Sequence, residues 1–340
     1  MIVSVLPKII DGVDLSEAEM TGVMEEIMTG QAAPAQMAAF LTALRIKGET
    51  ITELTAAAKV MRTHVTPLKA HTKKDTFLLD TCGTGGDNKS TFNISTVAAF
   101  VIAGAGVTVA KHGNRSVTST CGSADLMEGL GINIHVSIKM IEDCIDKIGL
   151  GFLYAPLFHS AMKYVAPVRK EIAVRTIFNM LGPLTNPAMA PAQLIGVYDA
   201  QLTETFGMVL KNLGSKHALI VHGSDHLDEI TTTGTSKVTV VKGDTLTTYY
   251  LDPAADCDIE RANPSDLRGE DREHSVSITY DILNGKRGPQ RDVVLLNSAA
   301  GLIAAGKVQD FREGIAAAAQ SIDTGNAHNI LKELVRATNQ

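Results

Sequence analysis

The sequence contains no tryptophan, and aromatic residues make up only 4% of its 340 residues. An aromatic-poor chain is badly suited to stacking the bases of single-stranded nucleic acid or to forming an aromatic-rich protein interface. Positive charge is also scarce, because 31 Lys and Arg against 37 Asp and Glu give a net charge of −6. Nucleic-acid-binding domains need a basic surface, so we expect no nucleic-acid partner.

Cysteine pairs and long apolar segments are missing as well. The four cysteines show no CxxC spacing, which argues against a zinc ribbon and against a disulfide scaffold. The most apolar stretch, Val97–Val109, is shorter than the roughly 20 residues of a membrane-spanning helix. The opening segment MIVSVLPKII lacks the basic and long apolar regions of a signal peptide. We therefore expect a cytoplasmic protein with no membrane partner.

The N-terminal part of the sequence predicts helices only. Ser16 followed by Glu19 is a capping-box pattern, and Pro34 suits the first turn of the next helix. A third helix is expected from about Thr52 to His64, and Pro67 closes the block. The length of 340 residues, with 45% hydrophobic and 20% charged residues, allows one large domain or two unequal globular ones.

After residue 70 the pattern changes to short apolar strands that alternate with helices. Strands are expected at Phe77–Leu79, Val107–Ala110, Leu194–Val197 and Ala218–Val221, with a hairpin formed by Val238–Val241 and Thr247–Leu251. Such alternation is typical of a mostly parallel sheet flanked by helices. We predict an α/β fold with a small all-helical N-terminal domain, residues 1–70, and a large domain with a mostly parallel central sheet, residues 71–340.

A glycine-rich loop, Asp80–Ser90, follows the first expected strand and precedes a helix. In α/β proteins this is where anions bind, through loop amides and a helix N-terminus. Asn88 occupies a glycine position of both the P-loop and the dinucleotide fingerprint, so neither motif matches. An ordinary turn would also explain the glycines. Asn93–Thr96, at the expected helix start, shifts the balance toward phosphate binding, although helix capping by Ser95 would be the favoured explanation of this run taken alone.

A second polar loop, Lys111–Ser119, follows the next expected strand. It places two cations and several hydrogen-bond donors beside Gly113, ahead of an expected helix over Gly122–Leu130. Loops of this kind at two neighbouring strand ends suit a ligand with two separated phosphate groups.

The adjacent acids Asp228 and Glu229 follow a further expected strand. Carboxylates there suit Mg²⁺ that bridges to phosphate, although two adjacent acids are often merely solvated. The acids and the following Thr-rich run superficially resemble the loop of type I phosphoribosyltransferases, but five intervening residues break that match. His222 and His226 lack a third ligand and a helical context, so no zinc site is expected.

Together and in this order, these motifs resemble the anthranilate phosphoribosyltransferase family over nearly the whole chain. The resemblance also rests on Gly122-Ser123-Ala124-Asp125, on the run Met162–Pro187 with VAPVRKE, RTIFN and LGPLTNP, and on His222-Gly223 before Leu227-Asp228-Glu229. It implies the fold of pyrimidine nucleoside phosphorylases, with an active site in the cleft between a helical and an α/β domain. It further implies a homodimer and a contribution of about residues 165–185 to the helical domain.

The resemblance also implies a reaction and the residues that serve it. The amine of anthranilate would attack C1 of 5-phosphoribosyl 1-diphosphate (PRPP), and diphosphate would leave, with two Mg²⁺ ions as cofactors. PRPP would be bound by residues of both loops and the helix that follows each, namely Gly83, Gly86, Asp87, Thr91, Asn93, Ile94, Ser95, Thr96, Lys111, His112, Gly113, Asn114, Arg115, Ser116, Val117, Thr118, Ser119 and Ser123.

The metal and anthranilate residues follow in the same way. Ser95 would hold one Mg²⁺, and Asp228 with Glu229 the second. Anthranilate would meet Gly83, Asn114 and Arg169. An arginine can bind a carboxylate through two parallel hydrogen bonds, although a helix salt bridge is the other explanation for Arg169. No catalytic base is expected, because an arylamine is already a neutral nucleophile at pH 7.

Five residues depart from the family's common pattern: Asn88, Thr120, Ser160, Ala173 and His226. Thr120 removes a frequent lysine near the PRPP loops, and His226 stands beside the acidic pair where glycine is common. Two alternatives remain at this stage. One is a nucleoside phosphorylase-like enzyme, and the other is a nucleic-acid-binding protein of the same fold, which the negative net charge opposes.

Overall fold

The computed structural model describes residues 1–70, 76–86, 89–115 and 121–340. Its N-terminal block consists of helices α1 (Ile2–Ile10), α2 (Glu17–Met28), α3 (Pro34–Lys47) and α4 (Ile51–Thr63). The predicted capping box is confirmed, because the Glu19 amide donates to Ser16 Oγ at 3.3 Å and the Ser16 amide donates to the Glu19 carboxylate at 2.9 Å. Pro34 occupies the first turn of α3, as its fixed φ favours.

A seven-stranded sheet in the order β3-β2-β1-β4-β5-β6-β7 forms the centre of the remaining chain. The first five of these strands in the chain run parallel, and the last two are antiparallel. Their bounds are Leu79–Gly83 (β1), Val109–Gly113 (β2), Leu150–Tyr154 (β3), Ala192–Gly196 (β4), His217–Gly223 (β5), Ser236–Lys242 (β6) and Thr245–Leu251 (β7). The five parallel strands are buried almost throughout, as strands covered on both faces must be.

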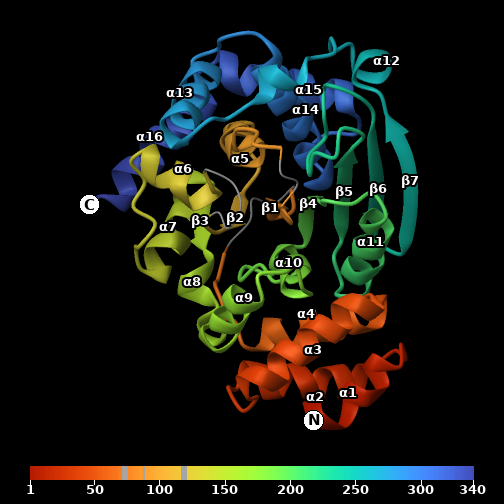
Figure 1. Ribbon diagram of the computed structural model, residues 1–340. Coiled ribbons are helices and arrows are strands. Elements are labelled where there is room, and N and C mark those ends of the chain that lie inside the picture. The colour runs from red at the N-terminus through yellow and green to blue at the C-terminus, as the bar shows by residue number, and fades with distance from the viewer. Residues whose placement is uncertain (71–75, 87–88, 116–120) are drawn as a thin grey trace.

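Helices cover both faces of this sheet (Figure 1). On one face α5 (Ile94–Gly104) packs against α14 (Pro289–Ala304), with α15 (Phe311–Asp323) and α16 (Asn326–Thr338) outside them. On the other face α11 (Leu202–Asn212) lies against β5 and β6 and contacts α4. The smaller elements are α6 (Ser123–Gly129), α7 (Ile138–Ile148), α12 (Pro253–Cys257), η3 (Pro264–Leu267) and α13 (Arg272–Leu283).

A run of short helices joins the sheet to the N-terminal block. It comprises α8 (Ala155–Phe158), η1 (Ser160–Tyr164), α9 (Ala166–Ile172), α10 (Phe178–Leu181) and η2 (Gly182–Leu184). Helix α9 packs on α3, and α10 packs on α4. Side chains of α9 and α10, including Val168 and Phe178, share one hydrophobic core with α1–α4. The segment that follows the edge strand β3 therefore packs against the N-terminal helices (Figure 1).

The fold class is confirmed, but the positions predicted for the first strands were wrong. β1 and β2 begin two residues later than expected and extend through residues assigned to loops, up to Gly83 and Gly113. The reason is that β1 and β2 carry buried polar side chains, among them Asp80 and Lys111. These residues interrupt the run of apolar residues by which a buried strand is recognised in a sequence. The hairpin was predicted correctly, whereas β3 was not predicted. Within the described ranges, no helix combines the length and apolarity needed to cross a membrane.

Candidate active site at the carboxyl edge of the sheet

Two paired glycines make room for Asp228 where β1 and β4 end. Gly83 and Gly196 are register partners on these strands. A β-carbon on Gly83 would lie 2.5 Å from Asp228 Oδ2, and one on Gly196 would overlap the Asp228 carbonyl oxygen. The chain then turns through Gly85 at φ +66°, and the Gly85 amide donates to Asp228 Oδ2 at 2.8 Å. The acid is thus held directly against the glycine-rich loop.

The neighbouring acid contacts a different element, the start of α5. Glu229 is buried, and its Oε1 accepts a hydrogen bond from the Ser95 amide at 3.1 Å, in the first turn of α5. The residue at the N-cap of α5 is Asn93, so capping by Ser95 is not the explanation for this motif. The Asn93 side chain instead donates to the carbonyl of Cys121 at 3.0 Å. The Ser95 hydroxyl therefore has no capping role, while its amide binds Glu229.

A buried pair of opposite charges lies beneath these elements. Lys111 on β2 is 1% exposed, and its Nζ donates to the Thr81 carbonyl and, at 3.3 Å, to Ser95 Oγ. Asp80 on β1 is fully buried, and its Oδ1 accepts from the His112 amide at 3.0 Å. Burial lowers the pKa of Lys111 and raises that of Asp80, while their mutual attraction opposes both shifts. The ammonium group is directed at the start of α5.

Two histidines meet behind the second loop. Nε2 of His112, on β2, lies 3.2 Å from Nε2 of His159, which follows α8. Burial lowers the pKa of His112 to about 3, aided by the nearby His159, and burial lowers the pKa of His159 to about 4. Both rings are therefore neutral at pH 7, and one must donate a proton to the other. His112 contributes a hydrogen bond here and no positive charge.

The second loop is tied to α6. Ser123 Oγ donates to the Asn114 carbonyl at 3.2 Å, and the Asn114 side-chain oxygen accepts from the Arg115 amide at 2.8 Å. The Arg115 guanidinium pairs with Glu128 at 2.7 Å and with Asp125 at 2.8 Å, and these contacts raise its pKa. Arg115, a residue expected to bind PRPP, is thus held by the acids of α6.

Two arginines come from the chain around α9. Arg169 is half-buried on α9, with its guanidinium carbon 5.7 Å from the centre of the Phe178 ring, and burial lowers its pKa. Among the residues with described positions, no carboxylate forms an ion pair with Arg169, so the salt-bridge explanation lacks a partner. Arg175, which the sequence did not single out, donates through Nη2 to the carbonyl of Gly86.

Comparison with known proteins identifies the family. Residues 3–65 match the helical bundle domain of a glycosyl transferase family, and residues 75–328 match the α/β domain of a glycosyl transferase family. The chain is 52% identical to anthranilate phosphoribosyltransferase from Symbiobacterium thermophilum over 99% of this chain and 98% of the relative. The chain belongs to the anthranilate phosphoribosyltransferase family. The Moorella thermoacetica member is also 52% identical, over 98% of both chains.

Solved structures of the family agree with the fold. The anthranilate phosphoribosyltransferase of Thermus thermophilus superposes with a TM-score of 0.92 at 40% identity, covering 98% of this chain and 99% of that one. The Saccharomyces cerevisiae enzyme in complex with PRPP and Mg gives 0.89 at 28% identity, covering 99% and 98%. The same yeast enzyme in complex with 4-fluoroanthranilate gives 0.89 at 27% identity, covering 99% and 97%.

Some family residues expected from the sequence lie outside the described residues, namely Asp87, Asn88, Ser116, Val117, Thr118, Ser119 and Thr120. Of the others, Ile94 and Thr96 are buried in α5, and Thr91 pairs through its backbone with Arg268. Gly113 ends β2 beside Ser123 and Phe152, where a β-carbon would collide with both side chains. The described parts of both loops therefore lie at one edge of the sheet, at the carboxyl ends of β1 and β2.

Two contributors were missed at the sequence level. Gly196 ends an apolar strand just as Gly83 does, and that shared pattern could have revealed it. Arg175 contacts Gly86 across 89 residues of sequence, so no local pattern signals the contact. Both residues act on the glycine-rich loop and the acid beside it.

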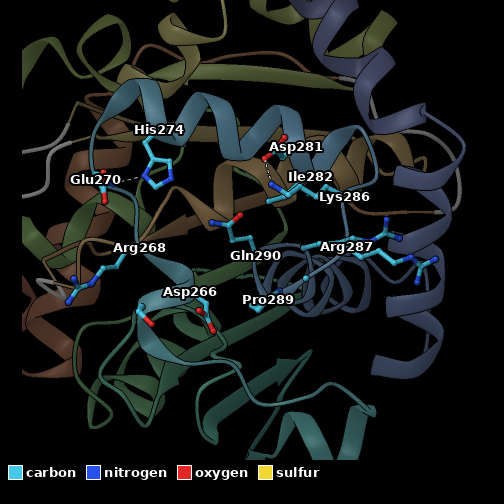
Figure 2. A pocket seen from close by; sticks show the side chains of 13 residues that line it. Asp266, Arg268, Glu270, His274, Asp281, Ile282, Lys286, Arg287, Pro289 and Gln290 are labelled. Atoms are coloured by element: carbon cyan, nitrogen blue, oxygen red, sulfur yellow. Dashed lines mark hydrogen bonds and ion pairs between the residues drawn. The ribbon is translucent and has the colours of Figure 1, made fainter.

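A separate cavity lies outside this edge (Figure 2). It has a volume of ≈ 530 Å³ and is bounded by η3, by residues near both ends of α13 and by the start of α14. Figure 2 shows Gln290 near its centre, and Lys286 paired with Asp281 on its wall at 2.7 Å. None of the residues expected to bind PRPP, anthranilate or Mg²⁺ lines this cavity.

The donor set at the sheet edge fits Mg²⁺. Asp228, Glu229 and Ser95 offer hard oxygen atoms, which this ion prefers over nitrogen or sulfur. In the part of the chain that the structure describes, no three His, Cys, Asp or Glu residues gather into a complete metal site. Mg²⁺ usually takes one or two carboxylates from the protein and its other ligands from phosphate and water.

Proposed function

We propose that the chain transfers the 5-phosphoribosyl group of PRPP to the amine of anthranilate, giving N-(5-phosphoribosyl)anthranilate and diphosphate. One observation carries the proposal: two adjacent carboxylates, Asp228 and Glu229, contact the two elements that bind phosphate. Asp228 holds the Gly85 amide at 2.8 Å, and Glu229 holds the Ser95 amide at 3.1 Å. A magnesium–diphosphate group needs both acids and backbone amides at one place.

The PRPP side of the proposal assigns the diphosphate to the glycine-rich loop and the start of α5. Ser95, Asp228 and Glu229 would hold Mg²⁺, and we propose two ions. When bound, Mg²⁺ would neutralise charge on the diphosphate leaving group. Lys111, buried beneath α5, adds fixed positive potential at the same place. A charge held in position before the reaction stabilises the developing anion without reorganisation.

The anthranilate side assigns recognition to Gly83, Asn114 and Arg169. A guanidinium binds the anthranilate carboxylate through two parallel hydrogen bonds, which fixes the orientation of the neighbouring amine. Desolvation of Arg169 strengthens that contact. The lone pair of the arylamine is available at neutral pH. Catalysis therefore requires that the amine be positioned against C1 of the ribose, and no strong base is needed to activate it. We propose no catalytic base.

We further propose that residues 1–70 and about 165–185 form one domain and the rest a second, with a homodimer formed through the N-terminal helices. The packing of α9 on α3 and of α10 on α4 supports the division. Exposed apolar side chains at Val3 (63%), Ile10 (67%) and Ile46 (81%) support the interface. Four buried cysteines without disulfides favour a reducing, cytoplasmic location.

The decisive experiment mixes the chain with Mg²⁺, PRPP and anthranilate and follows the loss of anthranilate fluorescence. We expect a loss that requires all three components and stops on addition of a chelator. No loss, together with phosphorolysis of thymidine or uridine, would favour the nucleoside phosphorylase alternative. Light scattering on the same sample measures the mass, and Ile46→Glu should convert a dimer to a monomer.

A further inference from the structure

The contact between Arg175 and the glycine-rich loop joins parts of the site that are far apart in sequence. Arg175 lies between α9, which carries Arg169, and α10. Its Nη2 donates to the carbonyl oxygen of Gly86, the last described residue before the loop residue Asp87. Gly86 adopts φ +78°, and a β-carbon there would lie 3.1 Å from the same Nη2. The guanidinium is therefore packed against the loop backbone.

A second contact of this guanidinium is with an aromatic ring. Its central carbon lies 4.4 Å from the centre of the Tyr198 ring, close enough for a cation–π interaction. Tyr198 follows β4, and its amide donates to Thr84 Oγ1 at 3.1 Å. The Thr84 amide in turn donates to the Gly196 carbonyl at 2.9 Å. The loop is thus held at Thr84 by the Tyr198 and Gly196 backbone and at Gly86 by Arg175, whose guanidinium also contacts Tyr198.

We propose that Arg175 is a positioning residue that holds the glycine-rich loop in the shape that accepts the diphosphate of PRPP. The inference rests on the proposed function and deepens it. With the Gly86 carbonyl turned to the guanidinium, its negative end is directed away from an incoming anion, and the arginine adds positive potential beside the loop. Lysine could supply the charge, but its ammonium group lacks the planar, multiply donating guanidinium that contacts both Gly86 and Tyr198.

The same arginine connects the two substrates. The segment from α9 through Arg175 carries Arg169 at one end and the loop contact at the other, only six residues later. Displacement of Arg175 should therefore act first on PRPP, since the loop loses its support directly. Anthranilate binding should change less, because Arg169 is anchored on α9 and over Phe178.

The test measures binding of PRPP with Mg²⁺ by calorimetry, without anthranilate, together with steady-state kinetics. For Arg175→Ala we expect the PRPP dissociation constant to rise about tenfold, as for loss of one charged hydrogen bond, with a similar rise in KM for PRPP. The KM for anthranilate should change much less. Arg175→Lys should recover only part of the affinity. Arg62→Ala is the matched control, because Arg62 donates to the Leu184 carbonyl at 2.8 Å away from the loop.

The outcomes separate this inference from the proposed function. If the unaltered chain binds no PRPP, the proposed function fails. If it binds PRPP and folded Arg175→Ala or Arg175→Lys binds it equally well, the positioning role is overturned. An equal rise in KM for both substrates also overturns it. Should Arg175→Ala fail to fold, Arg175→Lys and Tyr198→Leu decide the question, since Tyr198→Leu removes the stacking partner and should weaken PRPP binding in the same direction.

Discussion

The backbone of Gly196 lies so close to the carbonyl oxygen of Asp228 that no β-carbon fits between them. Gly196 ends β4 and Asp228 follows β5, so the contact fixes the acidic turn against the sheet. On the adjoining strand, Gly83 leaves the same kind of space for the Asp228 carboxylate, because a β-carbon there would collide with it. The position of Asp228 therefore depends on glycine at both strand ends.

Replacing Gly196 with alanine should displace Asp228. The new β-carbon would collide with backbone atoms, which cannot rotate away as a side chain can. We therefore expect the free energy of unfolding to fall by about 3 kcal/mol, the upper end of the range for overpacked substitutions. Magnesium-dependent PRPP binding should fall with it. Thermal unfolding and calorimetry check both effects. Gly182→Ala is the control for stability, because a β-carbon there meets nothing within 4 Å. Equal melting temperatures for the two variants would contradict the steric explanation.

The general site could be predicted from sequence because its motifs are local. The glycines at 83–86, the Asn93–Thr96 run and the acidic pair each occupy consecutive positions, and each follows a strand or begins a helix. In a parallel sheet such strand ends meet at one edge, so their convergence follows from topology. The contacts of Gly85 with Asp228 and of Ser95 with Glu229 are the result.

The remainder depends on contacts that no local pattern contains. Asp80 and Lys111 are charged, so the sequence pattern assigns them to loops, yet both lie in strands. Their side chains are buried, and the attraction between the two charges partly offsets the cost of burial. β3 is only five residues long and follows α7 directly after Gly149, so no turn-rich segment marks its start. Arg175 contacts Gly86 across 89 residues of sequence, from a segment between α9 and α10 whose position depends on their packing against the N-terminal helices.

His226 adopts a left-handed conformation, with φ +67°, in the turn before the acidic pair. Such a backbone costs a side-chain-bearing residue about 1 kcal/mol, a cost that glycine avoids. His226→Gly should therefore raise the melting temperature, despite the greater freedom of glycine in the unfolded chain. His226→Ala, which keeps the β-carbon, should not. If both variants gain equally, the side chain and not the backbone would be the source of strain.

The buried histidine pair should make stability depend on pH. Folded His112 and His159 have pKa values of about 3 and about 4, below the ordinary value of 6.5, so protons bind preferentially to the unfolded chain. Their contribution is complete above pH 6.5 and is lost as pH falls toward 4, at up to about 1.4 kcal/mol per pH unit for each ring. In melting curves from pH 7.5 to 5, His159→Gln should give a flatter dependence. His135→Gln, at an exposed position, should keep the original slope; identical slopes in all three proteins would refute the assignment.

Arg169 should determine affinity for anthranilate and leave PRPP binding largely unchanged. Its guanidinium is half-buried, and no described carboxylate forms an ion pair with it, so it retains the capacity to bind the carboxylate of the substrate. We expect Arg169→Ala to raise the KM for anthranilate about tenfold or more, as for loss of a charge-assisted pair. Arg169→Lys should restore little, because an ammonium group cannot form both parallel hydrogen bonds.

The control for this prediction is the neighbouring residue. Lys170 is exposed on the same helix, so Lys170→Ala removes a positive charge without touching the expected binding position. Its KM for anthranilate should stay near that of the unaltered chain. A comparable rise in both variants would mean that general positive charge on α9 attracts the substrate. An equal loss of affinity for PRPP and anthranilate in Arg169→Ala would place the arginine in the support of the whole cleft rather than at the carboxylate.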